Sequence, residues 1–402
     1  MQAIASQRTA EPILLNQIIE AREGARVRVR GHWLLDFTSS NYLGLAQHPR
    51  VRDAMVSAAE KWGASLAVPR AVARAGYSHE LETRLAHLTG ADAALVFPST
   101  LHAAIDVLTM LARDGMRLFV DERAYPISLT AARRASTTSR PLVRTRHDDP
   151  AALSRAVERC GRNTRPVVIC DGVYPDTGRP ALLRQIASVT RDHHGLVVMD
   201  DTQGVGLLGR QPTQLMPYGS GGGGSMVHTS SSGEGVVVIA SLSKALGVPV
   251  AVVAGQGEVI ARLMAQSSAF FHNSQPTPPV LAAALTALEV SANEGDQLRA
   301  NLLTLVRQFR AGLANLKLPL LTATEFPVQA RGMTDPETAR QVGIALVQDG
   351  VWPVATRARD PDYRAALTFV FTALHTERDI ERALTALDRA IIGSAPRLYA
   401  LR

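Results

Sequence analysis

Six short apolar runs alternate with helical segments through the middle of the chain. They occupy residues 94–97, 118–120, 167–170, 196–199, 236–239 and 250–254. Apolar runs of this length, separated by helical stretches, are typical of strands buried on both faces of a mostly parallel sheet. The pattern therefore predicts an α/β fold with a mostly parallel sheet covered by helices.

The chain is long enough for more than one domain. Its 402 residues are 46% hydrophobic, which allows a large core and a smaller second one. A capping-box pattern, Thr376-Glu377-Arg378-Asp379, predicts the start of a last helix. We expect an N-terminal segment with a hairpin at residues 1–48, a large domain at 49–288 and a smaller C-terminal α/β domain at 289–402.

Lys244 lies in the segment Ala-Ser-Leu-Ser-Lys-Ala-Leu-Gly, residues 240–247, between two apolar runs. An amine at the end of a buried strand, preceded by hydroxyl residues, suits a Schiff base to an aldehyde cofactor whose phosphate the hydroxyls bind. Taken alone, the segment equally fits a solvated lysine in a turn between two strands.

Asp200 supplies a second signal, 44 positions earlier, at the end of the apolar run 196–199. A carboxylate at the end of a parallel strand can pair with the protonated pyridine nitrogen of pyridoxal phosphate. An aspartate that caps the next turn is the alternative. The lysine and the acid, each ending a strand-like run, are more specific together than either is alone.

With these residues the chain resembles the α-oxoamine synthases, which are fold-type I pyridoxal phosphate enzymes. The resemblance covers nearly the whole length and rests on residues 36–45 with Asn41-Tyr42-Leu43-Gly44-Leu45, Gly76 to Glu82, Asp171-Gly172-Val173-Tyr174, Asp200-Asp201, Ser241-Leu242-Ser243-Lys244, Pro278-Pro279 and Ala373 to Thr376. It implies a homodimeric biosynthetic acyltransferase that condenses an amino acid or related amine with an acyl-CoA or carrier-protein thioester. A cytoplasmic location is expected on other grounds, because the sequence shows neither a membrane span nor a signal peptide pattern at residues 1–7. It also implies that Asn41 binds substrate and Asp171 contacts the cofactor.

The cofactor phosphate needs backbone amides and hydroxyls at the start of a helix. Ser99, Thr100 and Leu101 follow the run 94–97 and begin a helical stretch, and they match the family's phosphate segment. Ser241 matches a family phosphate ligand, and Ser274 matches the stretch that reaches the phosphate of a neighbouring subunit. Ordinary helix capping or a polar, proline-rich turn is the alternative for each.

Two departures concern the cofactor ring. Tyr125 stands where the family has a histidine stacked on the ring, so the aromatic face is kept and the titrating imidazole is lost. Gln203 stands where the family has a histidine bonded to the phenolic oxygen, and it can donate a hydrogen bond but cannot titrate.

A third departure concerns the substrate. Thr368 occupies the position of the family's arginine for the amino-acid carboxylate. Losing such a clamp without replacement costs on the order of 2–5 kcal/mol. Either the substrate differs or another arginine binds it, and Arg357 is the best placed, with Arg359 and Arg364 nearby in a polar loop that equally fits a solvated surface.

The mechanism implied by these matches starts with a Schiff base on Lys244. After an amine substrate displaces it, Lys244 removes a Cα proton while Asp200 keeps the ring nitrogen protonated. In the family, the carbanion then attacks the thioester and carbon dioxide leaves. Transamination or decarboxylation of an unusual amine, or a non-catalytic pyridoxal phosphate-binding protein, are the alternatives.

Composition argues against other classes of partner. The formal net charge is +7, but the arginines are spread along the chain without interleaved aromatics, so we expect no nucleic acid. We expect no membrane span, and residues 1–7 lack the order of a signal peptide. Two cysteines without paired spacing predict neither a disulfide framework nor a metal site.

A glycine-rich segment, residues 219–225, lies between the acid and the lysine. Its composition resembles that of a flexible linker, so we expect a mobile loop within the domain. It would either close over the substrate or be a tolerated surface insertion.

Overall fold

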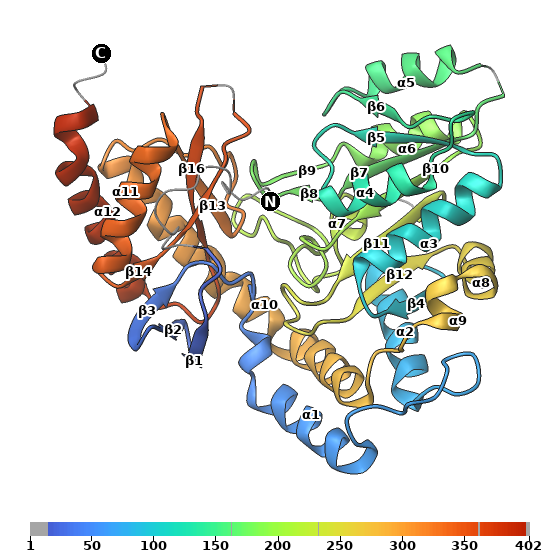
Figure 1. Ribbon diagram of the computed structural model, residues 1–402, viewed down its shortest axis with the longest axis horizontal. Coiled ribbons are helices and arrows are strands. Elements are labelled where there is room, and N and C mark those ends of the chain that lie inside the picture. Colours follow the sequence, from blue (N-terminus) through green and yellow to red (C-terminus); the bar gives the residue numbers. More distant parts are fainter. Residues whose placement is uncertain (1–14, 162, 232, 361, 399–402) are drawn as a thin grey trace. The chain divides into compact units, whose positions relative to one another are not determined.

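The computed structural model describes residues 15–161, 163–231, 233–360 and 362–398 (Figure 1). Residues 1–7, on which the expectation about a signal peptide rests, lie outside this part. The chain divides into two compact units: a larger one of Leu45–Tyr174 and Pro180–Asp296, and a smaller one of the residues up to Gly44, Pro175–Arg179 and the residues from Gln297 onward. The domain limits at residues 48 and 288 stay a prediction. Over the described ranges, no helix has the length and apolarity to cross a membrane.

The larger unit is built on a seven-stranded sheet. Neighbouring strands are parallel except at β12, which is antiparallel to both β4 and β11. This confirms the predicted α/β fold, and each of the six apolar runs is a strand. In sheet order the strands are β4 (Ala93–Phe97), β12 (Ala251–Gly255), β11 (Val236–Ser241), β10 (Leu196–Asp200), β7 (Pro166–Asp171), β5 (Arg117–Asp121) and β6 (Val143–Thr145).

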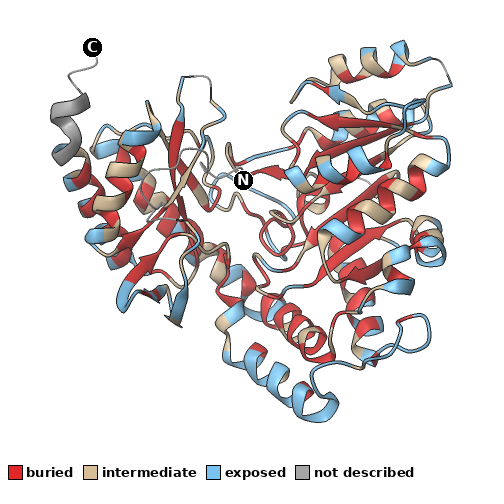
Figure 2. Cartoon of the chain, in the orientation of Figure 1, coloured by how far each residue is buried: buried red, intermediate tan, exposed pale blue. Residues whose placement is uncertain are grey.

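Helices cover both faces of this sheet, because successive side chains of each strand point to opposite faces. Leu118 and Val120 pack in the same core as residues of α3 and α4, whereas Phe119 packs with Leu153 and Val157 of α5. Both faces are therefore apolar, and Figure 2 shows the strands as buried almost throughout. The helices are η1 (Leu45–Gln47), α1 (Pro49–Trp62), α2 (Gly76–Thr89), α3 (Thr100–Arg113), α4 (Pro126–Ala135), α5 (Pro150–Arg159), α6 (Leu183–Arg191), α7 (Ser225–His228), α8 (Gly257–Gln266) and α9 (Ser268–His272).

The helix α10 (Pro278–Asn315) and a short ribbon of two strands each include residues of both units. The helix begins in the larger unit and ends in the smaller one. A short two-stranded ribbon is formed by β8 (Val173–Tyr174) and β9 (Arg179–Pro180).

The smaller unit contains two further sheets. One has the order β1 (Ile19–Glu23), β2 (Arg26–Val29), β3 (His32–Asp36) and β14 (Val351–Trp352), and the other has the order β13 (Val328–Met333), β16 (Ala365–Val370) and β15 (Val354–Thr356). The remaining helices are α11 (Pro336–Gln348) and α12 (Glu377–Leu398). Its core includes packed rings: Phe37 stacks on His375 with 4.4 Å between centroids, and Phe309 lies 5.0 Å from Phe369.

Candidate functional site

The carboxyl ends of four parallel strands carry polar residues at one edge of the seven-stranded sheet. Asp121, Asp171, Asp200 and Ser241 are the last residues of β5, β7, β10 and β11. The register pairs Asp200 with Asp171 on one side and with Ile239 on the other. This edge of an open α/β sheet is where ligands typically bind.

Asp200 is partly exposed at this edge. Its Oδ1 accepts a hydrogen bond of 3.0 Å from the backbone N–H of Thr202. Burial raises the pKa of Asp200, while the Thr202 hydrogen bonds and the charge of Lys244 oppose the rise. The carboxylate therefore gains from any further positive charge brought to it.

Lys244 lies in the turn after β11, close enough to Asp200 for their charges to interact. Burial lowers the pKa of the Lys244 amine, and Asp200 partly offsets this. A lowered pKa increases the neutral fraction of the amine, which is the form that attacks an aldehyde or takes a proton.

Lysine is rare in this chain, and this makes Lys244 distinctive. The sequence has 43 basic residues, of which only Lys61, Lys244 and Lys317 are lysines. Lys61 and Lys317 are exposed, whereas Lys244 is partly buried. Arginine serves equally as a surface cation, but its guanidinium cannot act as a nucleophilic amine. The presence of Lys244 in the turn near Asp200 therefore indicates a role for its amine in chemistry, and not only as a surface charge.

Tyr125 and Asp171 are held together at the same edge. The backbone N–H of Tyr125, which precedes α4, donates a 3.0 Å hydrogen bond to Oδ1 of Asp171. Burial raises the pKa of the Tyr125 hydroxyl, and the charges of Asp200 and Asp171 raise it further. The tyrosine therefore lies within electrostatic range of the acid at the centre of the site.

The start of α3 provides the amides expected for a phosphate. Ser99 is the N-cap residue, and its side chain accepts a hydrogen bond from the His102 amide. Thr100 and Leu101 follow as the first helical residues, whose amides have no partner within a helix. The Ser99 hydroxyl also lies 2.8 Å from Nδ1 of His102, a contact that sequence reasoning missed.

Hydroxyls gather at the end of β11. Oγ of Ser241 lies 2.8 Å from Oγ of Ser243, and the Ser241 N–H donates to Oγ1 of Thr202 at 3.0 Å. The strand β4, which precedes Ser99, ends at the same sheet edge, because Phe97 and Ser241 both pair with Ala251 of β12.

Four of the predicted residues come from segments other than the strand ends of this edge, and a fifth lies in the turn after β10. Ser274 is exposed between α9 and α10, and its N–H donates to the side chain of Asn273. Asn41, Arg357 and Thr368 belong to the smaller unit. Gln203 lies partly exposed in the turn after β10, three residues beyond Asp200.

Asp201, the second acid of the pair, points away from Lys244 and into the protein. It is 1% exposed and accepts hydrogen bonds from the N–H and the hydroxyl of Ser225. A Cβ added at Gly172 or Gly204 would lie 2.2 Å from its Oδ1, and one at Gly224 would lie 2.3 Å from its Oδ2. Only glycine leaves room for the carboxylate at these three positions.

The glycine-rich segment therefore differs from the mobile loop that its composition predicts. Gly222 to Ser225 are buried, and Gly206 and Gly209 donate backbone hydrogen bonds to the carbonyls of Gly222 and Tyr218. The glycines permit close backbone packing around Asp201 instead of supplying flexibility.

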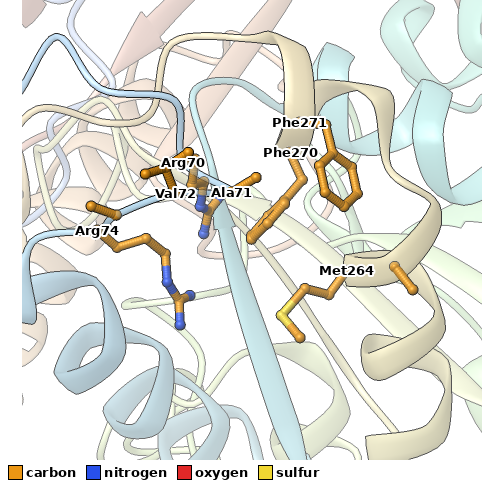
Figure 3. Close-up of a pocket in the computed structure, with 9 residues that line it drawn as sticks. Arg70, Ala71, Val72, Arg74, Met264, Phe270 and Phe271 are labelled. Carbon is orange, nitrogen blue, oxygen red and sulfur yellow. The ribbon is translucent and has the colours of Figure 1, made fainter.

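A groove of about 410 Å³ lies elsewhere in the larger unit (Figure 3). Its walls include Val72, Met264 and Phe271, and the buried Arg70 lies over the Phe270 ring at 4.5 Å. Arg70 is already bound to Glu82 and to the carbonyl of Val96. The groove is thus mainly apolar, and none of the predicted site residues lines it.

Comparison with known proteins assigns the class. Residues 33–387 match the family described as aminotransferase class I and II. The chain is 31% identical to the 8-amino-7-oxononanoate synthase of Stutzerimonas stutzeri over 96% of this chain and 94% of the relative. The chain belongs to the aminotransferase class I and II family. Within it, the chain belongs to the α-oxoamine synthase group.

Solved structures agree on the fold. A serine palmitoyltransferase from S. paucimobilis, solved with PLP and myriocin bound, superposes with a TM-score of 0.83 at 22% identity, covering 93% of this chain and 92% of that one. The 8-amino-7-oxononanoate synthase of Francisella tularensis gives a TM-score of 0.74 at 19% identity, with coverages of 90% and 99%. Both show the same architecture as this chain.

The residues at the sheet edge fit pyridoxal phosphate by their chemistry. Lys244 offers an amine of lowered pKa, and Asp200 is a carboxylate that burial destabilises. A helix start and neighbouring hydroxyls lie at the strand ends on the same edge. This donor set combines a Schiff-base amine, a partner for a protonated ring nitrogen and phosphate ligands.

We expect Asp201 to make stability depend on pH. Burial raises its pKa from 3.8 to about 7, so the folded protein holds a proton that the unfolded chain has lost between those values. Stability is therefore greatest below the unfolded pKa and falls, by on the order of 4 kcal/mol, as pH rises to about 7. Urea unfolding across this range should show the fall in wild type and a flatter profile in Asp201→Asn.

Asp53→Asn is the matched control, because the Asp53 side chain is 70% exposed. It should leave the pH dependence unchanged. If Asp201→Asn unfolds with the same pH profile as the wild type, the buried carboxyl does not carry the predicted proton.

Proposed function

We propose that this protein is a pyridoxal phosphate-dependent acyltransferase that condenses an amino acid, or a related amine, with an acyl thioester. The observation that carries the proposal is the interaction between Lys244 and Asp200 at the carboxyl edge of the sheet. The relationship to 8-amino-7-oxononanoate synthase over 96% of the chain supports the reaction class. Serine palmitoyltransferases share its fold.

Pyridoxal phosphate, when bound, supplies an electron sink for a carbanion at the substrate Cα. Lys244 would hold the cofactor aldehyde through its amine, and the same amine would be suited to take the Cα proton of the substrate. Asp200 would stabilise a proton on the ring nitrogen. The positive ring would in turn compensate the burial that raises the pKa of Asp200.

The other residues of the edge bind and orient the cofactor. The amides of Thr100 and Leu101, with the hydroxyls of Ser99 and Ser241, bind the phosphate. Tyr125, whose backbone N–H is held by Asp171, would pack its ring against the cofactor. Gln203 would donate a hydrogen bond to the cofactor without exchanging a proton.

The substrate carboxylate needs a cation in the smaller unit. Thr368 is 9% exposed, and its hydroxyl lies 3.4 Å from that of Thr356. Arg357 follows Thr356 directly, at the end of β15, and is exposed. We propose that Arg357 binds the carboxylate in place of an arginine at 368, and that Asn41 also contacts the substrate. The acyl donor is an acyl-CoA or a carrier-protein thioester.

The threonine at position 368 also favours a second function. If Thr368 marks a substrate whose carboxylate is absent or is the group to be lost, the chain is an aminotransferase acting on an unusual amine or a decarboxylase. A non-catalytic cofactor-binding protein is less well supported, because such a protein has no need for a partly buried lysine next to a ring-nitrogen acid.

A homodimer is part of the proposal. Val72, Met264 and Phe271 on the groove are 76%, 41% and 40% exposed in the single chain. Ser274 follows three residues after Phe271, so a second copy seated here would bring Ser274 close to the neighbour. A cytoplasmic location is the remaining expectation from composition.

Trapping the cofactor tests the proposal directly. We expect borohydride reduction of the purified protein with pyridoxal phosphate, followed by peptide mapping, to place the phosphopyridoxyl group on Lys244. Lys244→Ala should abolish the label because Lys244 is the lysine whose charge interacts with Asp200. Lys61→Ala is the control and should be labelled like the wild type. Label on Lys61 or Lys317 would refute the site.

Arg357 is tested by comparing an amino acid with the amine that lacks its carboxylate. We expect Arg357→Ala to raise the dissociation constant of the amino acid about 10- to 1000-fold, the range for one lost charge-assisted clamp. The amine should bind wild type and variant equally. Arg159→Ala, an exposed arginine at the end of α5, is the control and should bind both ligands like the wild type. Equal effects on both ligands would favour the unusual-amine function.

The apolar groove is tested by sedimentation. We expect Phe271→Asp to raise the dimer dissociation constant about 10-fold or more, because a charge would replace an aromatic side chain at the interface. Leu215→Asp is the control, since Leu215 is 77% exposed and lies off the groove. A monomeric wild type, or equal effects of both variants, would contradict the dimer at this surface.

A further inference from the structure

Thr202 connects the two halves of the proposed cofactor site. It follows Asp200 and Asp201 in the turn after β10, and it is partly exposed. Its N–H donates to Oδ1 of Asp200 at 3.0 Å, and its side chain is among the groups that lower the pKa of that carboxyl. On its other side, Oγ1 accepts the backbone N–H of Ser241 at 3.0 Å.

The direction of these hydrogen bonds follows from chemistry. A backbone N–H can only donate, so the Ser241 amide uses a lone pair of the Thr202 hydroxyl. The single hydroxyl proton is then available for the carboxylate, which in its ionised form can only accept. The relay therefore runs from Ser241 through Thr202 to Asp200, and it favours the ionised carboxylate.

The relay joins the carboxyl ends of the neighbouring strands β10 and β11, which carry the proposed cofactor-binding residues. Asp200 ends β10, whereas Ser241 ends β11 and precedes Lys244 by three residues. The Ser241 hydroxyl, a proposed phosphate ligand, is itself bonded to Ser243. Thr202 thus binds the acid through its N–H and, through its hydroxyl, the segment that carries the amine and the phosphate hydroxyls.

We propose that Thr202 is a positioning residue that keeps Asp200 ionised and aimed at the cofactor ring and holds the Ser241–Lys244 segment in register with it. This inference rests on the proposed function. An ordinary turn needs only the Thr202 backbone N–H on Asp200, and any residue provides that. The hydroxyl, which accepts from Ser241 and has its proton available for Asp200, is what the proposal assigns.

Two substitutions separate the hydroxyl from the shape of the side chain. Thr202→Val keeps the β-branch and the backbone N–H but removes the relay, and Thr202→Ser restores a hydroxyl. We expect Thr202→Val to raise the dissociation constant of pyridoxal phosphate about 10- to 100-fold, as for losing a hydrogen bond to a charged group. Thr202→Ser should lie within about threefold of the wild type by the same reasoning.

The pH dependence of cofactor affinity gives a readout that a merely structural role would not move. Losing the hydroxyl raises the pKa of Asp200, so affinity should begin to fall at a higher pH in Thr202→Val than in the wild type. The charged or titratable groups that interact with Asp200 are Lys244, Asp201, Tyr125 and Cys170. Asp200→Asn, which has no carboxyl to protonate, should lack this acid limb and so identify Asp200 as its source.

Controls keep this inference distinct from the proposed function. Thr190→Val removes another buried hydroxyl, one that bonds only within α6, and should leave cofactor affinity unchanged. If borohydride labels Lys244 but Thr202→Val binds the cofactor with wild-type affinity and pH profile, the role of Thr202 is refuted and the function stands. If Lys244 is not labelled, the function itself fails. Equal losses in the valine and serine variants would also refute the relay.

Discussion

The parallel register of β7, β10 and β11 is the constraint on which the proposed site depends. It places Asp200 beside Asp171 and Ile239, and it brings the turn after β11 to the same edge. The strands are held there by two apolar faces, each covered by helices, so the edge cannot move without disturbing both cores. Desolvation at this edge then lowers the pKa of Lys244 and raises that of Asp200, which prepares both groups for a cationic, aldehyde-bearing cofactor.

The acid pair shows how two adjacent carboxylates acquire different roles. Asp200 keeps contact with the site, whereas Asp201 is enclosed by glycines and bonded to Ser225. Strand alternation sends the two side chains in opposite directions. The buried acid ties the glycine-rich segment to the end of β10, so a stretch that resembles a linker in composition becomes part of the support beneath the site.

Three positions depart from the family pattern: Tyr125, Gln203 and Thr368. The first two concern proton transfer, and the third concerns binding of the substrate carboxylate. In the proposed site, Tyr125 and Gln203 would stack or donate where the resemblance implies histidines, and Lys244 would be the group that moves a proton. Thr368 sits in a strand beside Ala330 and Val354, without a cation on its own side chain. In the proposed function, an exposed arginine after β15 would therefore bind the substrate carboxylate.

The sequence by itself determined the class of fold, because short apolar runs between helical segments permit few arrangements other than a helix-covered sheet. It also singled out Lys244 and Asp200, since each ends such a run and parallel strands end at a common edge. It did not reveal β6, a three-residue strand too short for a periodic signal. Nor could it show which of Asp200 and Asp201 faces the lysine, that the glycines enclose a carboxylate, or that Thr202 bonds to both Asp200 and Ser241. Those features depend on contacts between residues some 20 to 50 positions apart, and only the tertiary structure decides them.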